Sequence, residues 1–295
     1  MLSKDLIARI RKIEIRTRRM VEDITAGAYH SVFKGSGIEF EDVREYTQDD
    51  DVRDIDWNVT AKMGTPYIKK YVEERELTVM LLVDASASGF YGSGDKTKND
   101  TAVEIASLLA FSAIRNNDKV GLMLFTDKVE LYLPPKSGRL HTLRLIRDLV
   151  AIKPEGKGTN IVIALEKIMK ILRKRAVVFL ISDFIDEKNS YLKALTLANK
   201  RHDMIAVRVL DKMEFQWPIS GYLNITDSES SLDSYFLASK KNVEEYLKIA
   251  EQFHSSHANV CSKAKVDMID VRCGEDIVKP LMKFFKQRER IVNKI

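Results

Sequence analysis

From Leu77 onward, short apolar runs alternate with longer segments in which apolar residues recur at helical spacing. Uninterrupted apolar runs are typical of strands buried on both faces, and their alternation with helices favours a mostly parallel sheet. We therefore predict a doubly wound α/β domain over residues 76–295, with helices on both faces of the sheet. The predicted strands span residues 77–83, 119–125, 176–182, 204–210 and 265–271, and the predicted helices span residues 99–116, 139–151, 160–174, 188–200, 239–257 and 275–290.

Residues 1–75 have a different pattern and form the second predicted part of the chain. Residues 2–25 carry apolar side chains at helical spacing, which predicts an amphipathic helix. Residues 28–75 contain short alternating pieces around a polar loop, which is typical of β-strands. Residues 211–237 interrupt the later α/β pattern with turn residues between strand-like runs, which predicts a hairpin excursion. We expect this hairpin to pair with the strands of 28–75 in one small β-subdomain.

The composition narrows the class of protein and its compartment. A share of 45% hydrophobic and 31% charged residues suits a folded core with a soluble surface, and a net charge of +5 is too small to indicate nucleic-acid binding. The N-terminus has no apolar segment typical of a secretion signal, and Cys261 and Cys273 are too close together to staple the chain. We therefore expect a cytoplasmic protein, with membrane contact at most peripheral, through the basic helix of residues 2–25.

Oxygen-bearing side chains occur in three loops that should gather at one edge of the predicted sheet. A buried strand runs into a D-x-S-x-S sequence, which contains Asp84, Ser86 and Ser88. Thr159 lies in a glycine-rich loop before a predicted helix, and Asp183 follows another buried strand. Because ligands bind at the carboxyl ends of strands in open α/β sheets, we expect these side chains to converge. Hydroxyl and carboxylate oxygens suit Mg²⁺, with Mn²⁺ or Ca²⁺ as alternatives.

This set of side chains resembles the metal-ion-dependent adhesion site (MIDAS) of von Willebrand factor A domains, which have a Rossmann-like fold. The resemblance implies that Ser86 and Ser88 touch the ion directly and that Thr159 joins the coordination shell. It implies that Asp84 and Asp183 act largely through water. One coordination position would stay open for an acidic side chain of a protein partner, so the implied function is metal-dependent protein interaction and not catalysis.

The flanking sequence resembles a bacterial family known only as a domain of unknown function, number fifty-eight, which is associated with MoxR-type AAA+ ATPases. The resemblance implies an adaptor that works with such an ATPase in the assembly or maturation of other proteins. Gly89 stands where related domains often carry methionine, which leaves the ligand set untouched. The matching residues are 37–40, 43–46 and 50–57, then Asp211, Glu214, Pro218, Gly221, Asp227 and Glu229, and finally Leu281, Phe284, Phe285 and Arg288.

Arg53, Asp56 and Trp57 are candidate partner-binding residues. Tryptophan and arginine are enriched in the hot spots of protein interfaces, which favours a docking role. The alternative is a structural role, in which Trp57 and the neighbouring charged pair tie the β-subdomain to the sheet.

A nucleotide-binding P-loop is an alternative interpretation of the segment that follows the D-x-S-x-S sequence. Gly89 and Gly94 have the spacing of a P-loop, and Lys96 follows. Asp95 lies between the second glycine and the lysine, which shifts the lysine out of register and places a carboxylate where phosphate would bind.

Two further alternatives concern other chemistry. A Mg²⁺-dependent phosphohydrolase could use Asp84 as its nucleophile, but such enzymes want a second carboxylate where Ser86 stands. His254, His257 and Cys261 share one helical face and could hold zinc, with ordinary helix-surface residues as the alternative. A purely structural scaffold is the remaining class. We predict a protein-interaction module that is not an enzyme.

Overall fold

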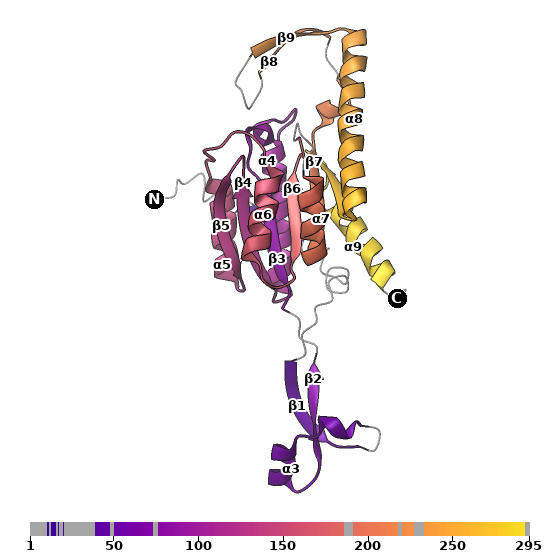
Figure 1. Ribbon diagram of the computed structural model, residues 1–295. Helices are drawn as coiled ribbons and strands as arrows, with labels where there is room; N and C mark the ends of the chain where they lie inside the picture. The colour runs from indigo at the N-terminus through magenta and orange to yellow at the C-terminus, as the bar shows by residue number, and fades with distance from the viewer. Residues whose placement is uncertain are drawn as a thin grey trace. The chain divides into compact units, whose positions relative to one another are not determined.

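A six-stranded sheet, in the order β10-β7-β6-β3-β4-β5, lies at the centre of the larger part of the protein in a computed structural model (Figure 1). Neighbouring strands are parallel except β4 and β5, which are antiparallel. Chain order runs from β3 to one side of the sheet and then to the other, which confirms the predicted doubly wound α/β class. The strands are β3 (Thr78–Asp84), β4 (Lys119–Phe125), β5 (Val129–Lys136), β6 (Val177–Ser182), β7 (Asp203–Leu210) and β10 (Asp267–Arg272).

The chain divides into a smaller unit, Lys34–Leu77, and a larger unit of Met1–Phe33 with Thr78–Ile295. The sequence pattern instead groups residues 1–33 with the smaller part. The structure describes residues 11, 13–15, 17, 20, 39–47, 50–72, 76–185, 191–217, 220–226 and 233–292. In this described part of the chain, none of the helices is both long and apolar enough to cross a membrane.

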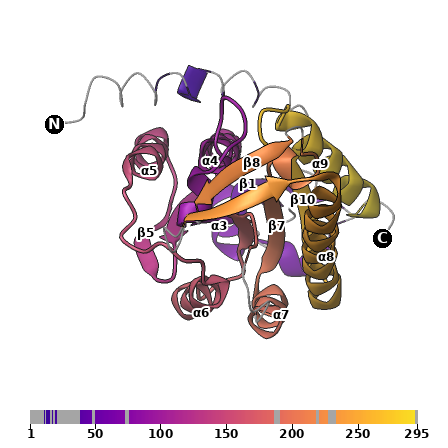
Figure 2. The same ribbon diagram turned by 90° about the horizontal axis from the view of Figure 1, so that it is seen from above.

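Helices cover both faces of the six-stranded sheet, with α4 and α5 on one face and α6 and α7 on the other (Figure 2). Strand β3 is buried from its second residue onward, as expected for a central parallel strand. Helix α8 continues past the predicted end at residue 257, because Val260, Cys261 and Ala264 pack into the core on its inner face. The helices are α4 (Lys98–Arg115), α5 (Arg139–Ala151), α6 (Ile161–Ile171), α7 (Leu192–Arg201), α8 (Lys240–Ala264) and α9 (Val278–Val292), with 3-10 helices η2 (Ala87–Phe90) and η3 (Lys212–Glu214).

The edge strand β5 is absent from the sequence-based prediction. Its sequence contains Pro134 and Pro135, which cannot donate hydrogen bonds to a neighbouring strand. Proline is tolerated at a sheet edge because one side of an edge strand needs no partner, and β5 occupies such an edge beside β4. The two prolines are therefore the reason that the sequence pattern did not predict this strand.

The hairpin predicted within 211–237 is present, but its predicted pairing with residues 28–75 is wrong. Strands β8 (Gly221–Thr226) and β9 (Asp233–Ala238) form their own antiparallel sheet. Aromatic contacts connect this hairpin to α8 instead, since Trp217 lies 5.3 Å from Phe236 of β9 and 4.6 Å from Tyr246 of α8 between ring centroids. Sequence periodicity predicts that a hairpin forms but does not predict which element the hairpin packs against.

The smaller unit contains the antiparallel pair β1 (Glu39–Glu45) and β2 (Tyr67–Val72), the 3-10 helix η1 (Val52–Asp54) and the helix α3 (Trp57–Met63). Its strands confirm those predicted within 28–75. Asp56 caps α3 by accepting hydrogen bonds from the backbone N–H groups of Asn58 and Val59. Gly64 ends this helix with a φ of 79°, in the left-handed region that glycine adopts without strain.

The predicted N-terminal helix over residues 2–25 lies largely outside the described residues. Those that are described there, residues 11, 13–15, 17 and 20, are helical. Ile13 and Thr17 are buried, and Glu14 forms a 2.9 Å ion pair with Arg139 at the start of α5. These contacts join this stretch to the rest of the larger unit, to which it belongs.

Replacing Arg288 of α9 by methionine is expected to lower the free energy of unfolding by about 2 kcal/mol, because it removes three charge-assisted hydrogen bonds. The guanidinium donates twice to Asp203 at 2.8 Å and once to Asp267 at 2.6 Å, and it lies over the ring of Phe284. Urea denaturation measures the loss. Arg290→Met on the exposed side of the same helix is the control, and an equal loss in both variants would contradict the prediction.

Candidate functional site

The D-x-S-x-S sequence forms a tight turn at the carboxyl end of β3. Asp84 is the last residue of the strand, and its Oδ1 accepts a 2.9 Å hydrogen bond from the backbone N–H of Ser86. A short aspartate side chain that bonds to the backbone two residues on is typical of such turns. The turn brings the hydroxyls of Ser86 and Ser88 to 3.1 Å from each other. Three oxygen-bearing side chains from five consecutive residues therefore lie at one point of the sheet edge.

The neighbouring strand β6 supplies the second set of side chains. The hydroxyl of Ser182 donates a 2.6 Å hydrogen bond to Oδ2 of Asp84 and accepts a 2.9 Å bond from the backbone N–H of Phe184. Asp183 accepts a bond from the N–H of Ile185, and Phe184 has a φ of 57°, in a region unfavourable for a bulky residue. Strain of this kind is maintained only where surrounding contacts over-determine the backbone.

The loop that contains Thr159 approaches through its backbone. The carbonyl of Lys157 accepts a 2.9 Å hydrogen bond from the N–H of Ala87, inside the D-x-S-x-S turn. The N–H of Asn160 donates to the carbonyl of Thr126 at the end of β4, and the Asn160 side chain caps α6. The hydroxyl of Thr159 is buried and has no hydrogen-bond partner in the structure. A buried orphan hydroxyl is costly in a protein interior, so a bound group that accepts or coordinates it would be stabilising.

Four of the five predicted metal ligands line one small cavity, and the fifth, Thr159, lies on the adjoining loop. The cavity has a volume of about 10 Å³, close to the least that holds one water molecule. Hard oxygens from hydroxyls and carboxylates, a water-sized space and an orphan hydroxyl fit a small divalent cation. The residues that line the cavity are Asp84, Ser86, Ser88, Gly89, Lys98, Asn99, Ala102, Ile181, Ser182, Asp183 and Val209.

The carboxylates of Asp84 and Asp183 repel each other electrostatically. Burial, together with the nearby charge of Asp183, raises the pKa of Asp84 to about 7. Hydrogen bonds from Ser182 and Ser86 oppose it by stabilising the carboxylate. A cation next to both carboxylates would stabilise their charged forms.

A lysine already provides part of that positive charge. The ammonium of Lys98, in the first turn of α4, lies 3.1 Å from Oδ2 of Asp183 and 2.7 Å from Oε1 of Glu214 in η3. Burial lowers the pKa of Lys98, but the charges of Asp183 and Glu214 outweigh burial and hold the pKa above its ordinary value. Lys98 is therefore a charged side chain inside the protein.

Sequence reasoning missed Lys98 and Ser182 as parts of the site. Lys98 had a visible signal: Thr101, Ala102 and Ile105 follow it at helical spacing and are buried, so the lysine falls on the core face of α4. A lysine at a core position is rarely tolerated without a paired charge. Ser182 had no such signal, because a serine at the end of a buried strand is ordinary.

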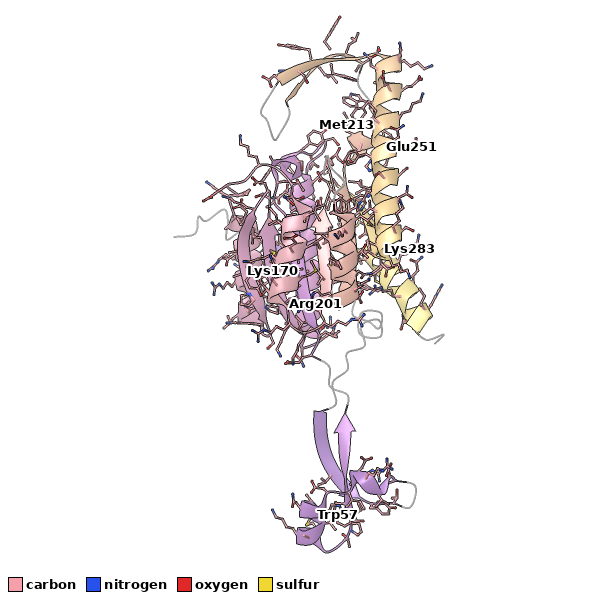
Figure 3. All side chains as sticks on the ribbon, in the orientation of Figure 1. Trp57, Lys170, Arg201, Met213, Glu251 and Lys283 are labelled. Carbon is pink, nitrogen blue, oxygen red and sulfur yellow. The ribbon has the colours of Figure 1, made fainter. Side chains whose placement is uncertain are left out.

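The predicted partner-binding residues belong to the smaller unit. Trp57, which is labelled in Figure 3, begins α3 and has 68% of its surface exposed, and Arg53 is exposed as well. Asp56 caps the helix through its side chain. Exposure of this degree is what the partner-binding prediction requires, and binding itself stays a prediction.

The segment proposed as an alternative P-loop has other internal partners. Lys96 binds both carboxylate oxygens of Glu104 at 2.7 Å, and the N–H of Ser93 donates to Asp211 at 3.0 Å. Thr97 is the N-cap of α4, with a reciprocal hydrogen bond to Asp100. These contacts use the groups that a phosphate would need.

The zinc alternative is not supported by the placement of its residues. The hydroxyl of Tyr191 lies 2.8 Å from Nδ1 of His257, whose ring stacks on Phe184 with centroids 4.1 Å apart. Within the described ranges, no group of three or more histidine, cysteine, aspartate or glutamate side chains could hold a metal ion. His257 and Cys261 are instead core residues of α8.

The sheet order and the oxygen cluster define a doubly wound α/β domain that carries its polar side chains at the switch point beside β3. The chain belongs to the family described as "Protein of unknown function DUF58", whose model matches residues 42–256, and this confirms the resemblance found in the sequence. Relatives include uncharacterized protein Mb1516 of Mycobacterium bovis and uncharacterized protein Rv1480 of Mycobacterium tuberculosis. Each is 25% identical over 287 residues, covering 97% of this chain and 90% of the relative.

Solved structures with partial likeness include the conserved hypothetical protein BatB from Bacteroides thetaiotaomicron, at 16% identity and a TM-score of 0.48. It is matched over 74% of this chain and 100% of its own. A von Willebrand factor type A protein from Catenulispora acidiphila matches over 76% of this chain and 44% of its own, at 10% identity and a TM-score of 0.42. The fold class of the present protein rests on its own sheet order.

Proposed function

We propose that this protein is a metal-dependent protein-interaction module. Mg²⁺ would be held by the hydroxyls of Ser86, Ser88 and Thr159, with Asp84 and Asp183 as the charge-balancing carboxylates. When bound, the ion supplies a coordination position that an acidic side chain of a partner protein can fill. The observation that carries the proposal is the gathering of hydroxyl and carboxylate oxygens from the ends of β3 and β6 around one water-sized cavity.

The hydrogen bonds around the cluster support binding more than turnover. Both oxygens of Asp84 accept bonds, from Ser86 and Ser182, which holds the carboxylate in one orientation. A nucleophilic or basic role needs a carboxylate that reaches the reacting atoms. This arrangement suits a residue that orients ligands and balances charge.

We further propose that the partner is a MoxR-like AAA+ ATPase and that the protein acts as its adaptor in the cytoplasm. Membership of the family supports this assignment through the association stated for the family resemblance. Two free thiols, Cys261 and Cys273, suit a reducing compartment. The exposed residues Arg53 and Trp57 of the smaller unit are the proposed second contact.

Isothermal titration calorimetry with Mg²⁺ is the first test. The wild-type protein is expected to bind, and Asp84→Asn and Ser86→Ala are expected to weaken binding at least about tenfold, because each alters the oxygen cluster. Ser255→Ala, at an exposed position of α8, is the matched control and should bind like the wild type. Absence of Mg²⁺ binding by the wild type would overturn the metal-dependent function.

A pull-down with the purified MoxR-like ATPase of the same genome tests the partner. Retention is expected with Mg²⁺, and it should disappear with a chelator and in both site variants. Retention that needs no metal would favour a scaffold. Phosphate release from a phosphoester that is lost in both variants would favour the phosphohydrolase instead.

A further inference from the structure

Lys98 is a buried lysine that faces the candidate metal site. Its side chain is 6% exposed, and it lies on the core face of α4 rather than on the solvent face. A long charged side chain is kept in such a place only by strong partners. The partners of Lys98 therefore indicate what the residue does.

Those partners are two carboxylates from segments far apart in the sequence. Asp183 follows β6 and Glu214 ends η3, and their side chains are 3% and 12% exposed. The ammonium bridges them, at 3.1 Å from the first and 2.7 Å from the second. In its buried surroundings the pair of contacts is little weakened by water.

The same lysine lines the cavity in which a divalent cation would be held. Asp84 and Asp183 line that cavity with it, so the cavity contains two carboxylates and one ammonium. If the lysine were neutral, Asp183 and Glu214 would each lose this positively charged partner. The ammonium therefore offsets negative charge that would otherwise attract a divalent cation to the cavity.

We propose that Lys98 sets the cation affinity of the site, because its ammonium competes with a divalent ion for Asp183. This inference rests on the proposed metal-dependent function and deepens it. Without metal, Lys98 holds Asp183 in place and compensates its charge. With metal bound, the ammonium stands beside a like charge, which weakens the affinity for the ion. The repulsion from Lys98 therefore keeps the binding of divalent ions reversible.

The test compares Lys98→Met, which keeps an unbranched side chain shorter by one atom and removes the charge, with the wild type. Titration calorimetry should show Mg²⁺ bound about tenfold to a hundredfold more tightly by Lys98→Met, since a buried like charge has gone. The variant should also melt at a lower temperature without metal and be stabilised by Mg²⁺ more than the wild type is. Lys96→Met is the matched control, because Lys96 is paired with Glu104 instead and should leave Mg²⁺ affinity unchanged.

A second pair of variants keeps the proposal testable if Lys98→Met does not fold. Glu214→Gln and the double variant Lys98→Met with Glu214→Gln differ only at residue 98. Compared with Lys98→Met alone, the double variant has one fewer buried carboxylate left without a positive partner. Tighter Mg²⁺ binding by the double variant than by Glu214→Gln supports the proposal. Equal affinity in this pair, or in Lys98→Met and the wild type, overturns it.

The two hypotheses fail in different ways. A wild-type protein that does not bind Mg²⁺, beside a Lys98→Met protein that does, would refute the proposed function and support the role of Lys98. A wild-type protein that binds Mg²⁺ as tightly as Lys98→Met would leave the proposed function intact and refute the role of Lys98.

Discussion

Acidification from about pH 7 to about pH 4.5 is expected to remove about 2 to 3 kcal/mol of folding free energy through His257 alone. Burial, aided by the charge of Arg208 and opposed by that of Asp270, lowers the pKa of His257 to about 3. The side chain is 1% exposed, with Tyr191 and Phe184 against its ring. The folded protein therefore keeps this histidine neutral where the unfolded chain protonates it.

The sign follows from which state binds more protons. The unfolded histidine takes up a proton as the pH falls below 6.5, and the folded one only near pH 3, so stability is complete above 6.5 and is lost between these values. Asp84 acts in the opposite sense, because a carboxyl whose pKa rises on folding is stabilised by acid. The effect of His257 is therefore measured as a difference between proteins that both contain Asp84.

The measurement is urea denaturation of metal-free protein at several pH values. His257→Gln should show a loss between about pH 7 and about pH 4.5 that is smaller by about 2 to 3 kcal/mol than that of the wild type. Tyr191→Phe removes the hydroxyl partner and keeps the histidine, so it should stay as sensitive to acid as the wild type. Parallel pH profiles for His257→Gln and the wild type would show that this histidine does not titrate on unfolding.

Alanine in place of Gly156 is expected to lower the free energy of unfolding by about 2 to 3 kcal/mol and to weaken Mg²⁺ binding about tenfold. A Cβ at this position would collide with Asp127 and with the side chain of Thr126. The backbone N–H of Gly156 also donates a 2.7 Å bond to Glu130, so the loop cannot move away without losing that bond. Relief of the clash must displace the loop that carries Thr159.

Gly94→Ala is the control for this substitution. Gly94 lies in the loop between β3 and α4, and a Cβ there would meet nothing within 4 Å. Urea denaturation and Mg²⁺ titration should therefore give wild-type values for Gly94→Ala. If Gly156→Ala bound Mg²⁺ as tightly as Gly94→Ala, the loop of Thr159 would have no part in metal binding.

The sequence predicted the fold well where periodicity carried the information. The five apolar runs all correspond to strands of one sheet, and the helices predicted between them are present and cover it. The prediction missed β5, because Pro134 and Pro135 are unfavourable in most strands although an edge strand tolerates them. It failed again for the hairpin of 211–237, whose partner is decided by Trp217 and not by strand pattern.

The candidate site shows the same division. Asp84 and Asp183 could be placed at one edge because the carboxyl ends of parallel strands lie at the same edge of a sheet. The turn at Ser86 could be predicted because its hydrogen bond joins residues only two positions apart. The role of Ser182 could not be foreseen, since its hydrogen bond to Asp84 joins residues that are 98 positions apart. Such a bond depends on strand order and register together, and neither is written in a local pattern.

The sequence by itself determined the class of fold, the edge at which polar side chains gather, and the kind of oxygen-bearing side chains found there. These properties follow from residue spacing along single strands and helices, where the backbone geometry is fixed. The tertiary structure alone decided that the ammonium of Lys98 lies between Asp183 and Glu214. A buried charge is stable only beside partners brought by other segments, so its position depends on the packing of the whole domain.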